Sequence, residues 1–374
     1  MDERALTERL VTYDTSTLDG MKSAAGFVKG WLEARDVEVT GDMHNGRPVL
    51  AATVGPEGGP TVVFHGHLDV VPAREDLFIP RVDGDRLYGR GAYDMKGGLA
   101  AMMCALREVA AQDRVRVHFL CVADEESEEE DELRGSNFLV AKGYRGDFAI
   151  TGEPTDLHIG VEAKGVLVLR IEVAGTSAHG STPWVGDNAV VKAIDVFRQI
   201  ESLPFARESS DQFDRPSINL GRIAGGDAIN RVPDACVIDV DVRYLPGQDP
   251  EAILAAVNQL DGTTATRTFH RHPVMVDREN PYVQALGAGI SRVVGKSDEQ
   301  ISIGRHGASD ANAFLDVGVP AVECGPVGAG HHGPEEWVSI RSLGQYRRAL
   351  VEFVTLLPAR LDAPGEDGRR LRIA

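Results

Sequence analysis

An α/β fold interrupted by a separate α+β segment is the architecture that this sequence predicts. Apolar strand-like runs alternate with helix-periodic segments from the N-terminus to about Lys164, which indicates a sheet with helices on both faces. The order of elements then becomes β-α-β-β-α-β, and the first pattern resumes after Val276. A length of 374 residues also favours two domains. We therefore expect one domain formed by residues 1–163 and 277–374, and an inserted domain of residues 164–276.

Periodicity and turn residues place the elements of the first part. Met21–Arg35 carries Phe27, Val28, Trp31 and Leu32 at helical spacing, so it is expected to be an amphipathic helix. Residues 87–94 are expected to form a glycine-rich loop, and residues 95–98 are expected to open a second helix that runs through residues 100–110. A third helix is expected at residues 136–141. Strands are expected at residues 49–54, 61–64, 115–122 and 148–150.

The inserted segment begins with a strongly alternating strand at Val166–Val173. The remaining pattern predicts a helix at 187–200, strands at 218–223 and 235–242, a helix at 250–260 and a strand at 263–269. This order is the ferredoxin-like arrangement of a small self-contained domain.

The last part returns to the first pattern. Helices are expected from Pro281, from Asp310 and over residues 343–356, with strands at 301–303 and 321–324. The polar tail after Pro358 is expected to be frayed.

The composition excludes several classes of partner. Lysine and arginine number 39 against 57 aspartates and glutamates, which gives a net charge of −18 and argues against nucleic acid or an anionic membrane surface. Four widely spaced cysteines form no C-x-x-C unit and are expected to be small buried hydrophobes. The first residues lack the basic and apolar regions of a secretory signal, and no apolar run approaches membrane-spanning length. We expect a cytoplasmic protein.

Metal-ligand side chains follow several of the predicted strands. The stretch V-V-F-H-G-H-L-D, residues 62–69, places imidazoles and a carboxylate at the end of a buried strand, which is costly unless something pairs with them. In open α/β sheets, such strand ends meet in a ligand-binding crevice. Nitrogen and oxygen ligands without thiolate suit zinc, with cobalt or manganese as alternatives. A two-metal hydrolase site is therefore predicted from His67 with Asp69, Asp94, the Glu125–Glu126 pair, Glu153 and the His331–His332 pair.

Eight motifs in order make the chain similar to a known family. They are G-H-L-D-V-V-P, G-R-G-A-Y-D-M-K-G-G, A-D-E-E, G-E-P-T, G-T-S-A-H-G-S-T-P, I-A-G-G-D-A-I-N-R-V-P-D, G-A-S-D-A-N and H-H-G-P-E-E-W-V. The chain resembles the two-zinc amidohydrolases that include acetylornithine deacetylase, succinyl-diaminopimelate desuccinylase, aminoacylases and glutamate carboxypeptidase. The resemblance covers nearly the whole chain and implies a zinc-peptidase-like mixed sheet with an inserted lid and dimerisation domain.

The resemblance also implies a role for each candidate ligand. Asp94 would bridge two metal ions, His67 and Glu153 would complete one site, and Glu126 and His332 the other. His65 and His331 are neighbours that could substitute as ligands. Asp69 would accept the other ring N–H of His67. Glu125 would be the general base, which takes a proton from water and delivers it to the leaving amine.

The inserted domain carries the remaining candidates. His179 would reach across a homodimer into the partner's site and help to hold the tetrahedral oxyanion. Arg243, Asn219 and Asn230 are candidates for binding the substrate carboxylate or the oxyanion, and a salt bridge or a turn cap is the alternative for each. Ser309 lies in G-A-S-D, which resembles a G-T-S-D loop that borders the substrate.

Together these features predict metal-dependent hydrolysis of the amide bond of an N-acyl amino acid. A deacylase of the acetylornithine or succinyl-diaminopimelate type is favoured. A dipeptidase or carboxypeptidase with the same two-metal centre is the alternative, and a non-catalytic binding protein on the same fold is a third reading. The acidic run 125–132 departs from the family pattern, and its function is open between a solvated loop and a rim that repels anionic acyl groups.

Overall fold

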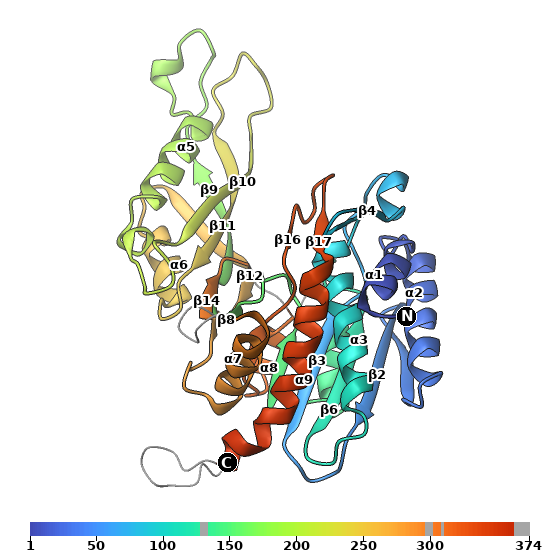
Figure 1. Ribbon diagram of the computed structural model, residues 1–374. Helices are drawn as coiled ribbons and strands as arrows, with labels where there is room; N and C mark the ends of the chain where they lie inside the picture. Colours follow the sequence, from blue (N-terminus) through green and yellow to red (C-terminus); the bar gives the residue numbers. More distant parts are fainter. Residues whose placement is uncertain (128–133, 296–301, 308–309, 363–374) are drawn as a thin grey trace. The chain divides into compact units, whose positions relative to one another are not determined.

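The computed structural model describes residues 1–127, 134–295, 302–307 and 310–362. The chain forms two compact units (Figure 1). The first unit contains Met1–Val161, Val276–Ile303 and Ser309–Ala374, and the second contains Glu162–Met275 with Gly304–Ala308. The second unit is thus continuous except for the short segment Gly304–Ala308, which the sequence analysis groups with the C-terminal part of the other domain.

A mixed sheet forms the centre of the first unit. Strands β3, β7 and β15 pair in parallel, as do β3 and β6, whereas β1, β2 and β6 pair antiparallel. The strand order is β1-β2-β6-β3-β7-β15-β8. The bounds are β1 Val39–His44, β2 Arg47–Val54, β3 Thr61–His67, β6 Arg116–Val122, β7 Phe148–Thr151, β8 Ile159–Ala163 and β15 Ala321–Glu323.

Helices cover both faces of this sheet because alternate strand residues point to opposite sides. On one face Val63, Leu120 and Phe314 belong to a core closed by α4 (Gly135–Ala141) and α8 (Asn312–Leu315). On the other face Phe148 stacks on Tyr282 of α7 with ring centroids 5.2 Å apart. The predicted α/β class is confirmed. The helices on this second face, labelled in Figure 1, include α3 Gly97–Val109, α7 Pro281–Val294 and α9 Ile340–Asp362. Helix α1 (Glu3–Val11) packs against α3. Helix α2 (Leu18–Glu33) packs against β1 and β2.

A glycine allows close packing near the end of β3. A Cβ atom on Gly66 would lie 2.5 Å from Cε of Met95 and 3.1 Å from Cδ1 of Leu99. A larger residue here would require the Met95 and Leu99 side chains to shift, and the two histidines beside Gly66 point to the opposite face.

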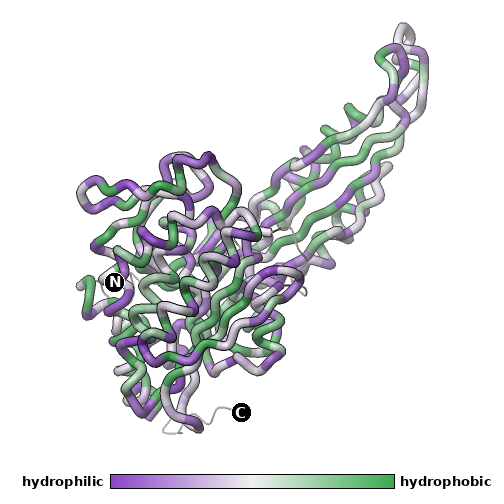
Figure 2. Tube along the Cα trace, turned by 90° about the vertical axis from the view of Figure 1, so that its right-hand side faces the viewer, coloured by the Kyte–Doolittle hydropathy of each residue, from purple (hydrophilic) through white to green (hydrophobic). Residues whose placement is uncertain are grey.

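The second unit is built on an antiparallel sheet with the order β10-β11-β9-β12. Helices α5 and α6 pack on one face, where Leu169, Ile171 and Ile238 are buried. Hydrophobic and hydrophilic positions alternate along these strands (Figure 2). The predicted β-α-β-β-α-β order matches β9 Gly165–Ala174, α5 Ala189–Ile200, β10 Ser217–Gly225, β11 Ala235–Tyr244, α6 Pro250–Asn258 and β12 Thr263–Arg271. Strand β13 (Val274–Met275) and part of β14 (Ser302–Arg305) also lie in this unit.

The prediction of a frayed tail after Pro358 is wrong for residues 359–362. Helix α9 continues through this proline to Asp362. Phe353 and Leu357 are fully buried, and the helix packs along α3 and α7, so tertiary packing outweighs the cost of one helix-breaking residue. Residues 363–374 lie outside the described residues.

Some elements have no counterpart in the sequence analysis. They include α1, β1, β8, β13 and a small sheet with the order β16-β17-β5-β4, formed by β16 Gly328–Ala329, β17 Trp337–Ser339, β5 Arg86–Tyr88 and β4 Arg81–Asp83. All four cysteines are unpaired and buried, as expected. Among the described helices none is both long and apolar enough to cross a membrane.

His118 on β6 provides a test of the buried sheet. Its Nδ1 lies 2.8 Å from Oγ1 of Thr53, and burial lowers the pKa of His118 to about 4. Between pH 6.5 and 4 the unfolded chain therefore binds more protons here than the folded chain, so stability falls as pH falls through this window. Replacing His118 by Gln should reduce the loss of unfolding free energy between pH 7.5 and 5 by about 1–2 kcal/mol. Urea unfolding at several pH values measures this, and identical pH dependence in both proteins would contradict it.

Candidate active site

Five acidic and histidine side chains from separate segments meet at one edge of the first unit's sheet. His67 ends β3, Glu126 follows β6 and Glu153 follows β7. Asp94 lies in η2 (Ala92–Lys96), an irregular helical turn, and His332 lies in the loop between β16 and β17. Ligand atoms of His67, Asp94 and Glu126 all lie within 4.8 Å of one another. This is a cluster of the size that a metal ion needs.

The two carboxylate oxygens of Asp94 face different histidines. Oδ1 lies 3.3 Å from Nε2 of His67, and Oδ2 lies 3.3 Å from Nε2 of His332. Glu153 Oε1 is 3.6 Å from the same nitrogen of His67, and Glu126 Oε1 is 2.8 Å from that of His332. The arrangement thus forms two groups of one imidazole and one glutamate, with Asp94 between them. This division is the one that the family resemblance implies.

Contacts on the far side of His67 fix the direction of its ring. Nδ1 lies 3.0 Å from the backbone oxygen of Asp69 and 3.5 Å from the carboxylate oxygen Oδ1 of the same residue. Nε2 is therefore left facing Asp94, and it is a buried atom without a hydrogen-bond partner among the described residues. Asp69 also accepts the backbone N–H of Glu126 at 2.8 Å, so one aspartate orients parts of both groups.

The neighbouring histidines point elsewhere. Nε2 of His65 lies 2.9 Å from Oγ of Ser136 and 3.5 Å from Oδ2 of Asp310. His331 is exposed, with its ring centroid 6.1 Å from that of Tyr93. The geometry therefore favours His67 and His332 over these two alternatives.

Burial and neighbouring charges shift the pKa values of several groups in and beside the cluster. Burial and the nearby Asp94 raise the pKa of Glu153 well above its usual range. Burial raises the pKa of Glu125 to about 8. Hydrogen bonds that His332 donates to Asp94 and Glu126 raise the pKa of His332 to about 10. Burial alone would raise the pKa of Asp94, but the imidazoles of His332 and His67 beside it hold the pKa below its usual range. So many carboxylates in one place are costly without positive charge.

Divalent cations fit this donor set. His67 offers an unpaired nitrogen, Asp94 offers one oxygen to each side, and no thiolate is present. Imidazole with carboxylate suits zinc, cobalt or manganese. The first group would be His67, Asp94 and Glu153, and the second would be His332, Asp94 and Glu126.

Comparison with known proteins identifies the family. Residues 63–356 match Peptidase family M20/M25/M40. The chain belongs to this family. A succinyl-diaminopimelate desuccinylase from Stenotrophomonas maltophilia (strain K279a) is 32% identical over 336 residues, which are 83% of this chain and 87% of that protein. An acetylornithine deacetylase from Edwardsiella ictaluri (strain 93-146) is 30% identical over 351 residues, 87% of this chain and 88% of that protein.

Solved structures of M20 proteins share the fold. Aminopeptidase PepT from Bacillus cereus ATCC 10987 has a TM-score of 0.78 at 20% identity, covering 95% of this chain and 98% of that one. An M20 family metallo-carboxypeptidase from Sulfolobus solfataricus has a TM-score of 0.73 at 18% identity, covering 96% and 100%. The predicted fold and family are confirmed. The M20 relatives carry deacylase and peptidase names, so the chain is an enzyme that acts on amide bonds, and divalent metal ions are expected in it.

Glu125 lies beside the cluster and is held by an arginine that the sequence analysis did not single out. Nη1 of Arg134 donates to the backbone oxygen of Glu125 at 2.8 Å and to Oδ1 of Asp310 at 3.2 Å, and Nη2 donates to the backbone oxygen of Ser127. Arg134 is only 6% exposed. Glu125 belongs to A-D-E-E and Arg134 follows this motif in the sequence, but the intervening residues 128–133, which include most of the acidic run, lie outside the described residues.

The candidates from the inserted domain all belong to the second unit. His179, Asn219 and Asn230 are exposed, and Nδ1 of His179 lies 2.8 Å from Oγ of Ser181. Arg243 donates from Nε to both carboxylate oxygens of Asp241, which is the salt bridge that the sequence analysis left open as an alternative. The remaining candidate, Ser309, lies outside the described residues. The roles of these residues stay predictions.

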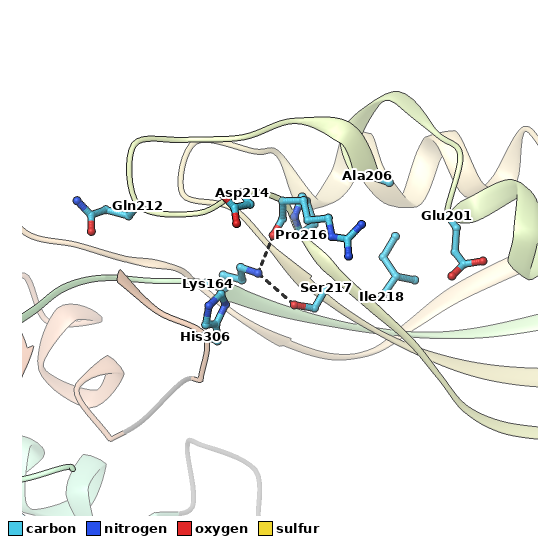
Figure 3. Close-up of a pocket in the computed structure, with 10 residues that line it drawn as sticks. Lys164, Glu201, Ala206, Gln212, Asp214, Pro216, Ser217, Ile218 and His306 are labelled. Atoms are coloured by element: carbon cyan, nitrogen blue, oxygen red, sulfur yellow. Dashed lines mark hydrogen bonds between the residues drawn. The ribbon is translucent and has the colours of Figure 1, made fainter. Parts of the chain in front are cut away.

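A cavity of about 520 Å³ in the second unit contains a buried cation that the sequence analysis used only to mark a change of pattern (Figure 3). Lys164 is 2% exposed, and its Nζ donates to the backbone oxygen of Arg215 at 2.7 Å and to Oγ of Ser217 at 3.1 Å. Burial, with Arg215 nearby, lowers the pKa of Lys164. His306 also lines the cavity. The only signal in the sequence is a lysine directly before a strand.

The shared position of Asp94 predicts a joint effect on two ions. Replacing Asp94 by Asn should weaken the affinity for both ions by more than about a hundredfold, because each loses a charged ligand. Competition with a coloured chelator and metal analysis measure the affinity and the number of bound ions. Asp113→Asn, which changes an exposed carboxylate of the same unit, is the matched control. Unchanged binding of either ion by the Asp94 variant would contradict a bridging role.

Proposed function

We propose that this M20 enzyme hydrolyses the amide bond of an N-acyl amino acid and releases a free amino acid or diamine. The observation that carries the proposal is Asp94, which presents one oxygen to His67 and the other to His332. Relatives at 30% identity or more over most of both chains, named as a desuccinylase and a deacetylase, support a deacylase. Zinc is the proposed metal, with cobalt or manganese as alternatives.

The proposed roles follow from the contacts of each side chain. His67, Asp94 and Glu153 would hold one ion, and His332, Asp94 and Glu126 would hold the other. Bound ions in such a pair act as Lewis acids on water and on the amide carbonyl.

Glu125 is the proposed general base. Burial raises its pKa to about 8, which suits a carboxylate that takes a proton from water and passes it to the leaving amine. Arg134 donates a hydrogen bond to the backbone oxygen of Glu125 and so fixes the position of the Glu125 backbone beside the cluster. Asp69 orients the His67 ring.

The second unit is the proposed lid and dimerisation domain. Helix α5 exposes Val191 and Ile194 on the side opposite its buried residues, and β10 is an edge strand with Ile223 exposed. An apolar helix face beside an open sheet edge is a surface that a second copy of the chain would cover. We infer a homodimer in which His179 serves the partner's site. Arg243, Asn219, Asn230 and Ser309 are the proposed substrate-binding residues.

The unpaired cysteines are typical of a reducing compartment, so the cytoplasm is the proposed location. A dipeptidase or carboxypeptidase is the alternative activity, since the same centre would serve a peptide bond and several structural neighbours carry peptidase names. The residues assigned to catalysis are all present, which argues against a non-catalytic binding protein.

A hydrolysis screen tests the activity. Metal-loaded protein should release amine from N-acetyl or N-succinyl amino acids faster than from dipeptides or N-formyl amino acids, and chelation should abolish this. The matched control is Glu125→Gln, which keeps the shape of the side chain but cannot take up the proton. It should retain bound metal and lose about 10²–10⁴-fold in kcat. Preferred cleavage of dipeptides would replace the deacylase by the peptidase alternative, and activity insensitive to chelators would reject the mechanism.

Mixing two inactive variants tests the dimer. In the proposed dimer each active site takes Glu125 from one subunit and His179 from the other. Glu125→Gln and His179→Ala therefore remove residues that different subunits contribute to one site. In a mixed dimer, one site therefore combines an intact Glu125 with the partner's His179. Random mixing should restore about a quarter of wild-type activity. Measured activity after subunit exchange, with sedimentation to confirm dimers, gives the result. No recovery in confirmed mixed dimers would contradict the role of His179 in the partner's site.

A further inference from the structure

Glu336 is a buried carboxylate with no role in the proposed mechanism. It is 2% exposed and lies in the loop before β17. In the sequence, Glu336 is the second glutamate of H-H-G-P-E-E-W-V. A buried carboxylate is costly unless several donors compensate for its lost hydration, so its partners show what it is for.

Four donors approach its two oxygens. Oε1 accepts the backbone N–H of Tyr93 at 3.0 Å and that of Asp94 at 3.1 Å. Oε2 accepts from Nη1 of Arg90 at 2.7 Å and from the backbone N–H of Gly91 at 3.0 Å. One side chain therefore binds three backbone groups of the segment that carries Asp94, although 242 residues separate the two in the chain.

Arg90 extends the contact to the second histidine. Its guanidinium is buried, and Nη2 donates to the backbone oxygen of His332 at 3.1 Å. His332 has φ of 61°, a left-handed conformation that costs energy for a residue other than glycine. A fixed donor on its carbonyl helps to hold this conformation. Glu336 and Arg90 thus contact the backbone of Asp94 on one side and that of His332 on the other.

We propose that Glu336, with Arg90, is a positioning residue that sets the separation of Asp94 and His332 and so determines how tightly the metal ions bind. Glu336 contacts the backbone of Asp94, and Arg90 contacts the backbone of His332. The inference rests on the proposed function, because it assigns the support of the same metal centre.

The Glu336→Gln substitution isolates this role. Gln has nearly the same volume but only one acceptor oxygen, so its NH₂ group must face either the N–H groups of Tyr93 and Asp94 or those of Arg90 and Gly91. Arg90→Lys keeps the charge but loses the forked contact that joins Glu336 to His332. The matched control is Glu3→Gln, which weakens another partly buried ion pair of the same unit, 3.3 Å from Arg347 and without contact to the cluster.

Zinc affinity is measured by competition with a coloured chelator on metal-free protein, together with thermal unfolding of the metal-free form and the visible spectrum of the cobalt-loaded form. We expect the Glu336→Gln and Arg90→Lys variants to bind zinc about 10–100-fold more weakly than wild type, which is the usual effect of losing a contact that supports a metal ligand. The cobalt spectrum of both variants should also change. The Glu3→Gln variant should bind zinc as wild type does. The kcat of the Glu336→Gln and Arg90→Lys variants should fall with little change in KM.

Two results would overturn the proposal. The first is a lower unfolding temperature of Glu336→Gln with wild-type zinc affinity and cobalt spectrum, which would show that Glu336 only stabilises the fold. The second result is wild-type zinc affinity in the Arg90→Lys variant. This result decides the test if the Glu336→Gln variant does not fold. Failure of the proposed function is a separate outcome, since it would appear in the wild-type protein as absent hydrolysis of acylated amino acids.

Discussion

Repulsion among carboxylates gathered around two imidazoles is the constraint on which the first unit depends. Asp94, Glu126 and Glu153 lie close enough to raise one another's energy, and burial increases this cost. Positive charge between the groups would offset this cost, and two divalent ions would supply it. Selection for binding these ions therefore explains side chains that are unfavourable for folding alone.

The fold holds these side chains close together by fixing the backbone segments that carry them. Parallel strands β3, β6 and β7 end at one edge of the sheet, and this edge receives His67, Glu126 and Glu153. Asp69 holds the His67 ring and the Glu126 backbone together. Backbone contacts of this kind cost little entropy when the side chains bind an ion, because the segments are already ordered.

The sequence predicts those features that are local in the chain. His67 follows an apolar run, and Glu125 with Glu126 follows another, so strand ends could be located from patterns of a few residues. The contact of Glu336 with the Asp94 backbone joins segments 242 residues apart, and no spacing rule predicts it. The three-residue strands of the small sheet are too short to show a period. The helix that continues past Pro358 depends on packing against α3 and α7, which local propensity does not contain.

The central claim is that Asp94 lies between two divalent ions. A crystal structure of the zinc-loaded protein, with anomalous scattering measured on both sides of the zinc absorption edge, tests it most directly. The account predicts two anomalous peaks about 3.5–4 Å apart, one beside His67 with Glu153 and one beside His332 with Glu126, each contacted by a different oxygen of Asp94. A single peak, or two peaks of which only one contacts Asp94, would contradict it.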